Sequence, residues 1–277
     1  MPYFETTTDG TRLHYVDYGP ATGRTVLFIN SSYFGTEMWE HQMLPLAAEG
    51  YRCVGLDRRG HGRSDDVWGG FDLDTLADDI GALVDHLDLT GITLVGHSLG
   101  TAEAVRYLTR HGSAGRVSRI ALVCGMTPGP ARSVDHPDGV DPALVEAGNE
   151  AFRRDRMAFF NGGAEGFFAL QFPENQVSPG HLRYAIDKCA VATARAGNAL
   201  NDLIVTLNVA PELAKITIPA LVVHGTDDAS APIDLTGRRA AALIPGAGFK
   251  VYEHAGHGLM TTHADRLNAD LREFITA

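Results

Sequence analysis

The sequence predicts an α/β fold in which a mostly parallel sheet carries helices on both faces and a block of helices is inserted between two strands. Short apolar runs recur along the 277-residue chain, and amphipathic helical patterns separate them. This alternation is typical of a parallel sheet, because each connection between parallel strands has to cross the sheet through a covering helix. Residues 126–211 break the alternation with helical patterns alone, which indicates the insertion.

Seven apolar runs are predicted to be strands. Most contain few polar residues, as expected of strands that are buried on both faces of a parallel sheet. The predicted strands cover residues 11–18, 25–30, 51–57, 92–97, 119–124, 220–224 and 249–253. Helices are predicted between them from apolar residues that recur every three to four positions, at residues 73–87, 98–110 and 264–274.

We expect residues 1–125 and 212–277 to form the core of sheet and helices, and residues 126–211 to form a helical cap. The cap shows helical patterns at residues 141–160, 164–170, 181–194 and 199–207. It also gathers seven large apolar side chains, most of which we expect to pack between helices. A few of them, with Phe160 and Phe168 as the candidates, should instead face a binding pocket below the cap.

Composition excludes several classes of protein. The formal net charge of −11 disfavours binding to nucleic acid or to anionic membranes. No apolar run is long enough for a transmembrane helix, and the first residues lack a basic region followed by an apolar stretch, so we expect a cytoplasmic protein without a secretory signal. A homo-oligomer is compatible with this composition. Neither a disulfide framework nor a cysteine metal site is expected, because the three cysteines are far apart in the chain: Cys53, Cys124 and Cys189.

The strongest motif is Gly96-His97-Ser98-Leu99-Gly100, which follows a predicted buried strand and begins a predicted helix. In this G-x-S-x-G pattern the glycines allow a sharp turn that exposes the serine hydroxyl. The same turn directs backbone N–H groups and a helix N-terminus toward the reacting atoms, where they stabilise a developing negative charge. Ser98 is therefore the predicted nucleophile, and we expect His97 to be structural or to line the pocket.

A serine hydroxyl needs a base to accept its proton, and the chain offers 12 histidines. His257 is the predicted base, because it lies in a Gly-flanked loop between the last strand and the last helix. His254 is the alternative, three residues earlier and still near the strand end. We expect His224, at the end of an interior strand, to be a buried histidine with satisfied hydrogen bonds.

An acid must orient the base, and in this arrangement it lies between the serine and the histidine in chain order. Asp227 and Asp228 both follow the strand at 220–224. Asp228 is the predicted acid, since the turn that begins at Gly225 should direct its side chain inward, whereas Asp227 should close the turn. An acid after the preceding strand is disfavoured, because no carboxylate follows that strand until Asp135.

The chain resembles the bacterial cofactor-free haloperoxidase, perhydrolase and arylesterase group of the α/β-hydrolase fold family. The resemblance rests on the sequence at 38–43, 49–65, 77–89, 93–100, 109–123, 236–247 and 251–271, and so covers most of the chain outside the cap. It implies an eight-stranded sheet, the same triad of Ser98, Asp228 and His257, and no cofactor or metal. It also implies an oxyanion hole formed by the backbone N–H groups of Ser32 and Leu99.

Two segments depart from that group. Asn30-Ser31 stands where the group usually has His-Gly, and the segment Asn30-Ser31-Ser32 is more similar to 3-oxoadipate enol-lactonases. Thr101 stands where a second glycine usually follows the motif. The polar groups of Asn30 and Ser32 either hydrogen-bond to the substrate or satisfy local backbone. Residues 57–64, rich in charge, are expected to be structural, with their charges paired to one another.

Three functions are compatible with these residues. The first is a serine hydrolase that cleaves a small-molecule carboxylic ester or lactone through an acyl-enzyme. The second is a perhydrolase or haloperoxidase that uses the same triad, and the third is a non-hydrolytic member of the fold, either a cofactor-free dioxygenase or a ligand receptor. For the first, the predicted substrate contacts are Asn30, Ser31, Tyr33, His97, Met126, Phe160 and Phe168.

Overall fold

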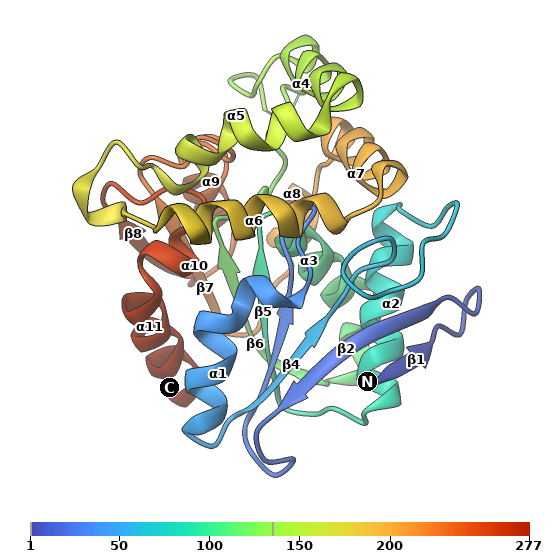
Figure 1. Ribbon diagram of the computed structural model, residues 1–277. Helices are drawn as coiled ribbons and strands as arrows, with labels where there is room; N and C mark the ends of the chain where they lie inside the picture. The colour runs from blue at the N-terminus through green and yellow to red at the C-terminus, as the bar shows by residue number, and fades with distance from the viewer. Residues whose placement is uncertain (1, 135) are drawn as a thin grey trace.

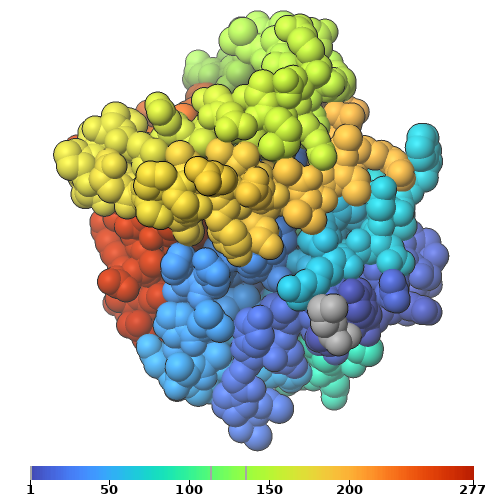
Figure 2. All heavy atoms as spheres, viewed as in Figure 1, coloured from blue at the N-terminus to red at the C-terminus, as the bar shows by residue number. Residues whose placement is uncertain are grey.

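The computed structural model describes residues 2–134 and 136–277 of the chain. A central sheet is covered by helices on both faces, and helices α4 to α7 lie across one end of it (Figure 1). Figure 2 shows the residues of these helices, coloured yellow-green to orange, lying directly against the blue and cyan atoms of the core. The α/β fold predicted from the alternating pattern is therefore confirmed. Within the described ranges, no helix has the length and hydropathy needed to cross a bilayer.

Over the described residues, the sheet contains eight strands in the order β1-β2-β4-β3-β5-β6-β7-β8. At one edge of the sheet, β2 is antiparallel to both of its neighbours, β1 and β4. All the pairs that follow in this order, from β4-β3 to β7-β8, are parallel. The strands are β1 Tyr3–Glu5, β2 Arg12–Tyr18, β3 Thr25–Ile29, β4 Arg52–Leu56, β5 Ile92–His97, β6 Val117–Val123, β7 Ala220–Gly225 and β8 Gly248–Tyr252. Because the parallel strands share one direction, the loops that follow them meet at one edge of the sheet.

The sheet separates two apolar clusters, and each cluster includes helices of one face. One cluster includes residues of α2 and α3, and the other includes residues of α1, α10 and α11. The helices of the core are α1 Glu40–Ala48, α2 Leu73–His86, α3 Leu99–His111, α8 Ala210–Leu213, α9 Gly237–Leu243, α10 Leu259–Thr262 and α11 Ala264–Thr276. Short 3₁₀ helices occur at Thr36–Trp39, Gly112–Ala114 and Pro173–Asn175.

The helices between β6 and β7 differ from those predicted. The helix expected at 141–160 is wrong, because the structure has α4 Pro142–Arg154 and α5 Arg156–Phe168. Asp155 separates them: its backbone is extended, and its side chain accepts hydrogen bonds from the N–H groups of Met157 and Ala158 as the N-cap of α5. The pieces predicted at 181–194 and 199–207 form α6 Pro179–Val191 and α7 Ala194–Thr206.

Candidate active site

Ser98 lies at the sharp turn between β5 and α3. Its backbone has φ 55° and ψ −123°, a conformation that non-glycine residues rarely adopt. The neighbouring glycines leave room for this turn. A Cβ on Gly96 would lie 2.6 Å from the carbonyl oxygen of Gly100, and a Cβ on Gly100 would lie 2.5 Å from that of Asn30. Both glycines of the motif are therefore required by close backbone contacts.

Replacing Gly100 by alanine is expected to destabilise the protein by about 1–3 kcal/mol, because the new methyl group overlaps two backbone carbonyls at the end of β3. Gly112→Ala is the matched control, since a Cβ there would meet nothing within 4 Å and the backbone has φ −60°. Urea unfolding of the two variants measures the difference. Equal stability of both variants would contradict the close packing at Gly100.

His257 and Asp228 form a buried pair behind Ser98. The Nδ1 atom of His257 lies 2.7 Å from Oδ2 of Asp228, and both side chains are almost completely buried. The other carboxylate oxygen accepts hydrogen bonds from the backbone N–H groups of Ser230 at 3.0 Å and Ala231 at 2.7 Å. These contacts fix the carboxylate, and the carboxylate fixes the imidazole ring with a proton on Nδ1. Nε2 then carries the lone pair that can accept a proton.

Charge on Asp228 is favoured by its neighbours. Burial alone raises the pKa of this carboxyl group, but His257 and His224 more than offset the effect and hold the pKa well below its ordinary value. His224 is fully buried, and its Nε2 lies 2.7 Å from the carbonyl oxygen of Ala231 and 3.2 Å from Oδ2 of Asp228. Its Nδ1 has no hydrogen-bond partner among the described residues, so the prediction of a fully satisfied histidine is wrong.

The alternative acid and base lie elsewhere. The carboxylate of Asp227 accepts a hydrogen bond from the hydroxyl of Thr226, beside the turn. His254 is exposed, pairs with Glu174 at 2.7 Å and stacks on Phe172 with ring centroids 4.2 Å apart. Asp135 lies outside the described residues. The structure thus brings Asp228, rather than Asp227, against His257.

A buried ion pair stabilises the segment that follows β3, at Asn30 and Ser31. Arg58 donates hydrogen bonds to the carbonyl oxygens of Asn30 at 2.9 Å and Ser31 at 3.1 Å. The same guanidinium pairs at 2.7 Å with Glu103 of α3, the helix that begins after Ser98. One ion pair therefore fixes the segment of Ser32 relative to the nucleophile helix.

The charges of residues 57–64 do not pair with one another, and that expectation is wrong. Their partners come from other elements of the fold, since a buried charge must be neutralised by whatever packs against it. Asp57 binds His14, Arg58 binds Glu103, and Arg59 binds Asp79 and Asp9.

Breaking the Arg58–Glu103 pair is expected to cost about 3–5 kcal/mol, because either partner left alone is an uncompensated buried charge. We therefore expect Arg58→Met and Glu103→Leu each to lower the free energy of unfolding by about that amount. The double variant should recover much of the loss, since both charges are then absent. Urea unfolding of all four proteins forms a double-mutant cycle, and strictly additive losses would contradict the pairing.

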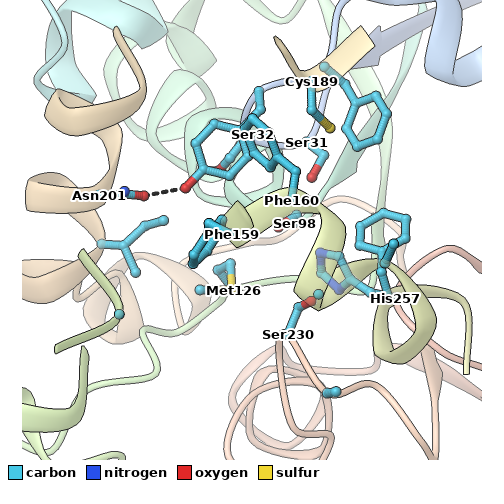
Figure 3. Close-up of a pocket in the computed structure, with 18 of the residues that line it drawn as sticks. Ser31, Ser32, Ser98, Met126, Phe159, Phe160, Cys189, Asn201, Ser230 and His257 are labelled. Atoms are coloured by element: carbon cyan, nitrogen blue, oxygen red, sulfur yellow. Dashed lines mark hydrogen bonds between the residues drawn. The ribbon is translucent and has the colours of Figure 1, made fainter. Parts of the chain in front are cut away.

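A cavity of about 510 Å³ contains both Ser98 and His257. Figure 3 shows their side chains directed into it below aromatic rings. Of the predicted substrate contacts, five line this cavity: Ser31, Tyr33, Met126, Phe160 and Phe168. Ser32, which was predicted for the oxyanion hole, lines it as well.

Asn30 and His97 are not among the lining residues, and we do not retain them as substrate contacts. Asn30 donates from Nδ2 to the carbonyl oxygen of Leu56. The Nε2 atom of His97 lies 2.9 Å from the carbonyl oxygen of His257, so this ring stabilises the backbone of the loop that carries His257. By contrast, the buried Oγ of Ser32 has no partner among the described residues.

Sequence reasoning missed the polar end of the cavity. Asn149 of α4 and Asn201 of α7 line it, and the hydroxyl of Tyr33 donates to the side-chain oxygen of Asn201. Figure 3 shows this bond on the side of the cavity away from His257. No local pattern could have found the contact, because Tyr33 and Asn201 are 168 residues apart in the chain.

Among the residues that the structure describes, two groups of side chains have metal-ligating atoms near one another. His97, Cys124 and His257 form one. Nε2 of His97 and Sγ of Cys124 already contact the backbone carbonyl oxygens of His257 and Gly256, and Nδ1 of His257 contacts Asp228. Burial raises the pKa of the Cys124 thiol well above its ordinary value, which disfavours the thiolate that a metal needs. Glu40, His41 and His181 form the second group, at the surface between α1 and α6.

Two buried histidines are expected to make the free energy of unfolding depend on pH. Burial is the main cause that lowers the pKa of His61 and of His97 to about 3. The unfolded chain binds protons at these positions below its ordinary pKa of about 6.5, whereas the folded protein does not. Stability is thus complete above pH 6.5 and falls as the pH drops toward 3, by roughly 3 kcal/mol per pH unit for two protons.

Urea unfolding at intervals from pH 7.5 to 4 measures this slope, and His61→Gln should remove about half of it. The lowered pKa values of Asp57 and Asp228 add a further loss below about pH 4. Constant stability between pH 6.5 and 5 would contradict the assignment of neutral buried histidines.

Comparison with known proteins agrees with this architecture. The family model described as alpha/beta hydrolase fold matches residues 24–264. The chain is 39% identical to the non-heme chloroperoxidase CPO-A1 of Kitasatospora aureofaciens, over 98% of each chain. It is 31% identical to the bifunctional esterase/perhydrolase DCH of Acinetobacter calcoaceticus, over 98% of this chain and 99% of the other.

A solved structure is also similar to this one. The enol-lactonase from Burkholderia xenovorans LB400 superposes with a TM-score of 0.85 at 26% identity, over the full length of both chains. The resemblance to the haloperoxidase group and to an enol-lactonase, inferred from the motifs, is confirmed. The chain is therefore an enzyme that belongs to the α/β-hydrolase fold family, among relatives of the non-heme haloperoxidases.

Proposed function

We propose that the protein is a serine hydrolase that cleaves a carboxylic ester or lactone through an acyl-enzyme, with Ser98, His257 and Asp228 as its catalytic triad. One observation carries the proposal. A serine with a strained backbone shares a cavity with a histidine whose Nδ1 is held by a buried carboxylate. This leaves Nε2 to act as the base, which is the arrangement that activates a serine hydroxyl.

The proposed reaction proceeds in two halves. His257 takes the proton of Ser98 as the serine oxygen bonds to the carbonyl carbon, and the backbone N–H groups of Leu99 and Ser32 bind the oxyanion. The protonated His257 then gives its proton to the leaving alcohol, and the acyl group stays on Ser98. In the second half His257 takes a proton from water, and the water oxygen bonds to the acyl carbon. The bond to Ser98 then breaks, and His257 returns the proton to the serine oxygen as the acid is released.

Leu99 and Ser32 suit the oxyanion for separate reasons. Leu99 is the first residue of α3, so its N–H group has no carbonyl partner within the helix and lies at the positive end of the helix dipole. Ser32 follows two residues whose carbonyl oxygens are held by Arg58. The unpartnered hydroxyl of Ser32 is available as a further donor to the substrate.

We also propose that residues 126–211 form a cap that closes the cavity over Ser98. Helices α4, α5, α6 and α7 all contribute to the lining of the cavity. The bond from Tyr33 to Asn201 ties the segment of the oxyanion hole to α7. The cap would therefore set substrate selectivity, while the core carries the chemistry.

Partitioning of the acyl group tests the acyl-enzyme. Butyrate esters of several phenols and alcohols are hydrolysed in the presence of methanol, and methyl butyrate and butyrate are both quantified. If all esters pass through one acyl-enzyme, the ratio of the two products is the same whatever the leaving group. A ratio that changes with the leaving group would mean that water attacks the ester directly, and would overturn the proposal.

Perhydrolysis is a second candidate, favoured by similarity to a chloroperoxidase and to a bifunctional esterase/perhydrolase. Here hydrogen peroxide replaces water in the second half, so the acyl group leaves Ser98 as a peracid. Adding peroxide in place of methanol to the same assay measures this route. A peracid yield no higher than that of the reaction without enzyme would exclude it.

A further inference from the structure

The residues that line the cavity carry almost no charge. Among the described residues that form its wall there is no aspartate, glutamate, lysine or arginine, and His257 is its one histidine. The wall is built instead from aromatic and aliphatic side chains, with serines, Tyr33 and the asparagines at positions 149 and 201 as its polar groups. Apart from His257, the wall offers a substrate neutral hydrogen bonds and apolar surface.

Three arginines on segments next to the wall already have partners. Arg58, beneath the segment of Ser31, pairs with buried Glu103. Arg153, on the helix that carries Asn149, pairs with Glu146 and Asp202. Arg156 donates to the carbonyl oxygen of Ala192. A carboxylate in the cavity would have to break one of these contacts to gain any of the three arginines as a counter-ion.

The positive potential beside Ser98 is used by the reaction itself. It comes from the N-terminus of α3 at Ser98, where the carbonyl oxygen of the substrate has to lie. A second anionic group cannot occupy the same donors. An ionised carboxylate moved from water to such a site loses its hydration without compensation, which is among the largest penalties in binding.

We propose that the cavity selects uncharged acyl and alcohol groups, so that esters or lactones with a carboxylate on the enclosed part are rejected. The inference rests on the proposed function, because it assumes that the reacting carbonyl lies at Ser98. The proposed selectivity divides esters and lactones by charge: the protein accepts neutral ones and rejects those that carry a carboxylate. The ring of a lactone is compatible with the cavity provided that the ring and its substituents are neutral.

A matched series of esters tests the selectivity. The probes are 4-nitrophenyl hexanoate, mono-4-nitrophenyl adipate, in which a carboxylate replaces the terminal methyl group, and the methyl ester of that adipate. After subtraction of spontaneous hydrolysis, we expect kcat/KM for the adipate to be at least 100-fold below that for the hexanoate. The methyl ester, which restores neutrality at greater length, should lie within about fivefold of the hexanoate.

Variants at the wall supply the converse test. Ile204→Lys places a cation at the wall, and Ile204→Met has a similar unbranched shape without charge. The lysine variant should raise the adipate-to-hexanoate ratio at least tenfold, and the methionine variant should leave it unchanged. If Ile204→Lys fails to fold, Leu144→Lys and Leu144→Met repeat the comparison at the rim, where Leu144 is 68% exposed.

The outcomes separate this inference from the proposed function. Equal kcat/KM for hexanoate and adipate in the wild-type protein would overturn the charge selectivity and leave the acyl-enzyme intact. Hydrolysis of neither neutral ester, nor of any neutral ester or lactone of similar size, would overturn the proposed function itself. A low value for the methyl adipate as well would assign the effect to length, and would also overturn the selectivity by charge.

Discussion

Ser98→Ala is expected to lower kcat for ester hydrolysis by at least about 10⁴-fold while the protein keeps its fold. The hydroxyl supplies the bond that holds the acyl group, so its removal forces water to attack the bound ester directly. The oxyanion donors and the cavity remain, and they account for whatever rate is left above that in water. Alanine fits the site, because it keeps the Cβ and adds no atom to a turn that is already crowded.

Ser230→Ala is the matched control for this prediction. Ser230 lines the same cavity, but its contribution to the site is the backbone N–H group that binds Asp228, which alanine retains. Its kcat should stay within a few-fold of that of the wild-type protein. Steady-state kinetics measures kcat of both variants, and circular dichroism checks that both are folded. If Ser98→Ala kept more than a tenth of the wild-type activity, Ser98 would not be the nucleophile.

Asp228→Asn is expected to lower kcat by about 10⁴-fold, through the tautomer of His257 rather than through lost structure. The two backbone N–H groups of Ser230 and Ala231 point at one carboxylate oxygen, so the amide oxygen of the asparagine must take that position. The amide NH₂ then faces Nδ1 of His257. Nδ1 has to accept, the proton moves to Nε2, and the ring can no longer take a proton from Ser98.

Asp227→Asn provides the comparison at the neighbouring position. The carboxylate of Asp227 accepts a bond from Thr226 and does not touch His257, so its loss should change kcat only a few-fold. Kinetics of the two asparagine variants, together with their thermal midpoints, measures the contrast. A larger loss in Asp227→Asn than in Asp228→Asn would exchange the roles of the two carboxylates.

The sheet and the predicted triad could be read from sequence because their signals are local. Buried strands appear as short apolar runs, and the turn at Ser98 needs small residues at fixed positions, as the close contacts of Gly96 and Gly100 explain. The three residues of β1 were missed, since so short an edge strand has no pattern of its own. The helix break at Asp155 was missed because an aspartate is read as a cap only where a helix start is expected.

The cavity wall could not be predicted in the same way. Its polar end depends on the contact between Tyr33 and Asn201, and the orientation of the oxyanion segment depends on Arg58 and Glu103, 45 residues apart. Such contacts depend on how elements that are distant in the chain pack together. A single sequence contains no local pattern that indicates this packing. His97 and Asn30 illustrate the same limit. Their positions in the sequence suggested substrate contacts, but the amide of Asn30 bonds to the backbone of Leu56 and the ring of His97 bonds to the backbone of His257.

The most direct test of the account is the covalent labelling of Ser98 by a fluorophosphonate. After incubation, the protein is digested and the modified peptide is identified by mass spectrometry, in the wild-type protein, Ser98→Ala and Asp228→Asn. We expect one stoichiometric adduct on Ser98 in the wild-type protein, none in Ser98→Ala, and much slower formation in Asp228→Asn. No adduct in the wild-type protein, as expected of a non-hydrolytic dioxygenase or receptor, or an adduct on another serine, would contradict the account.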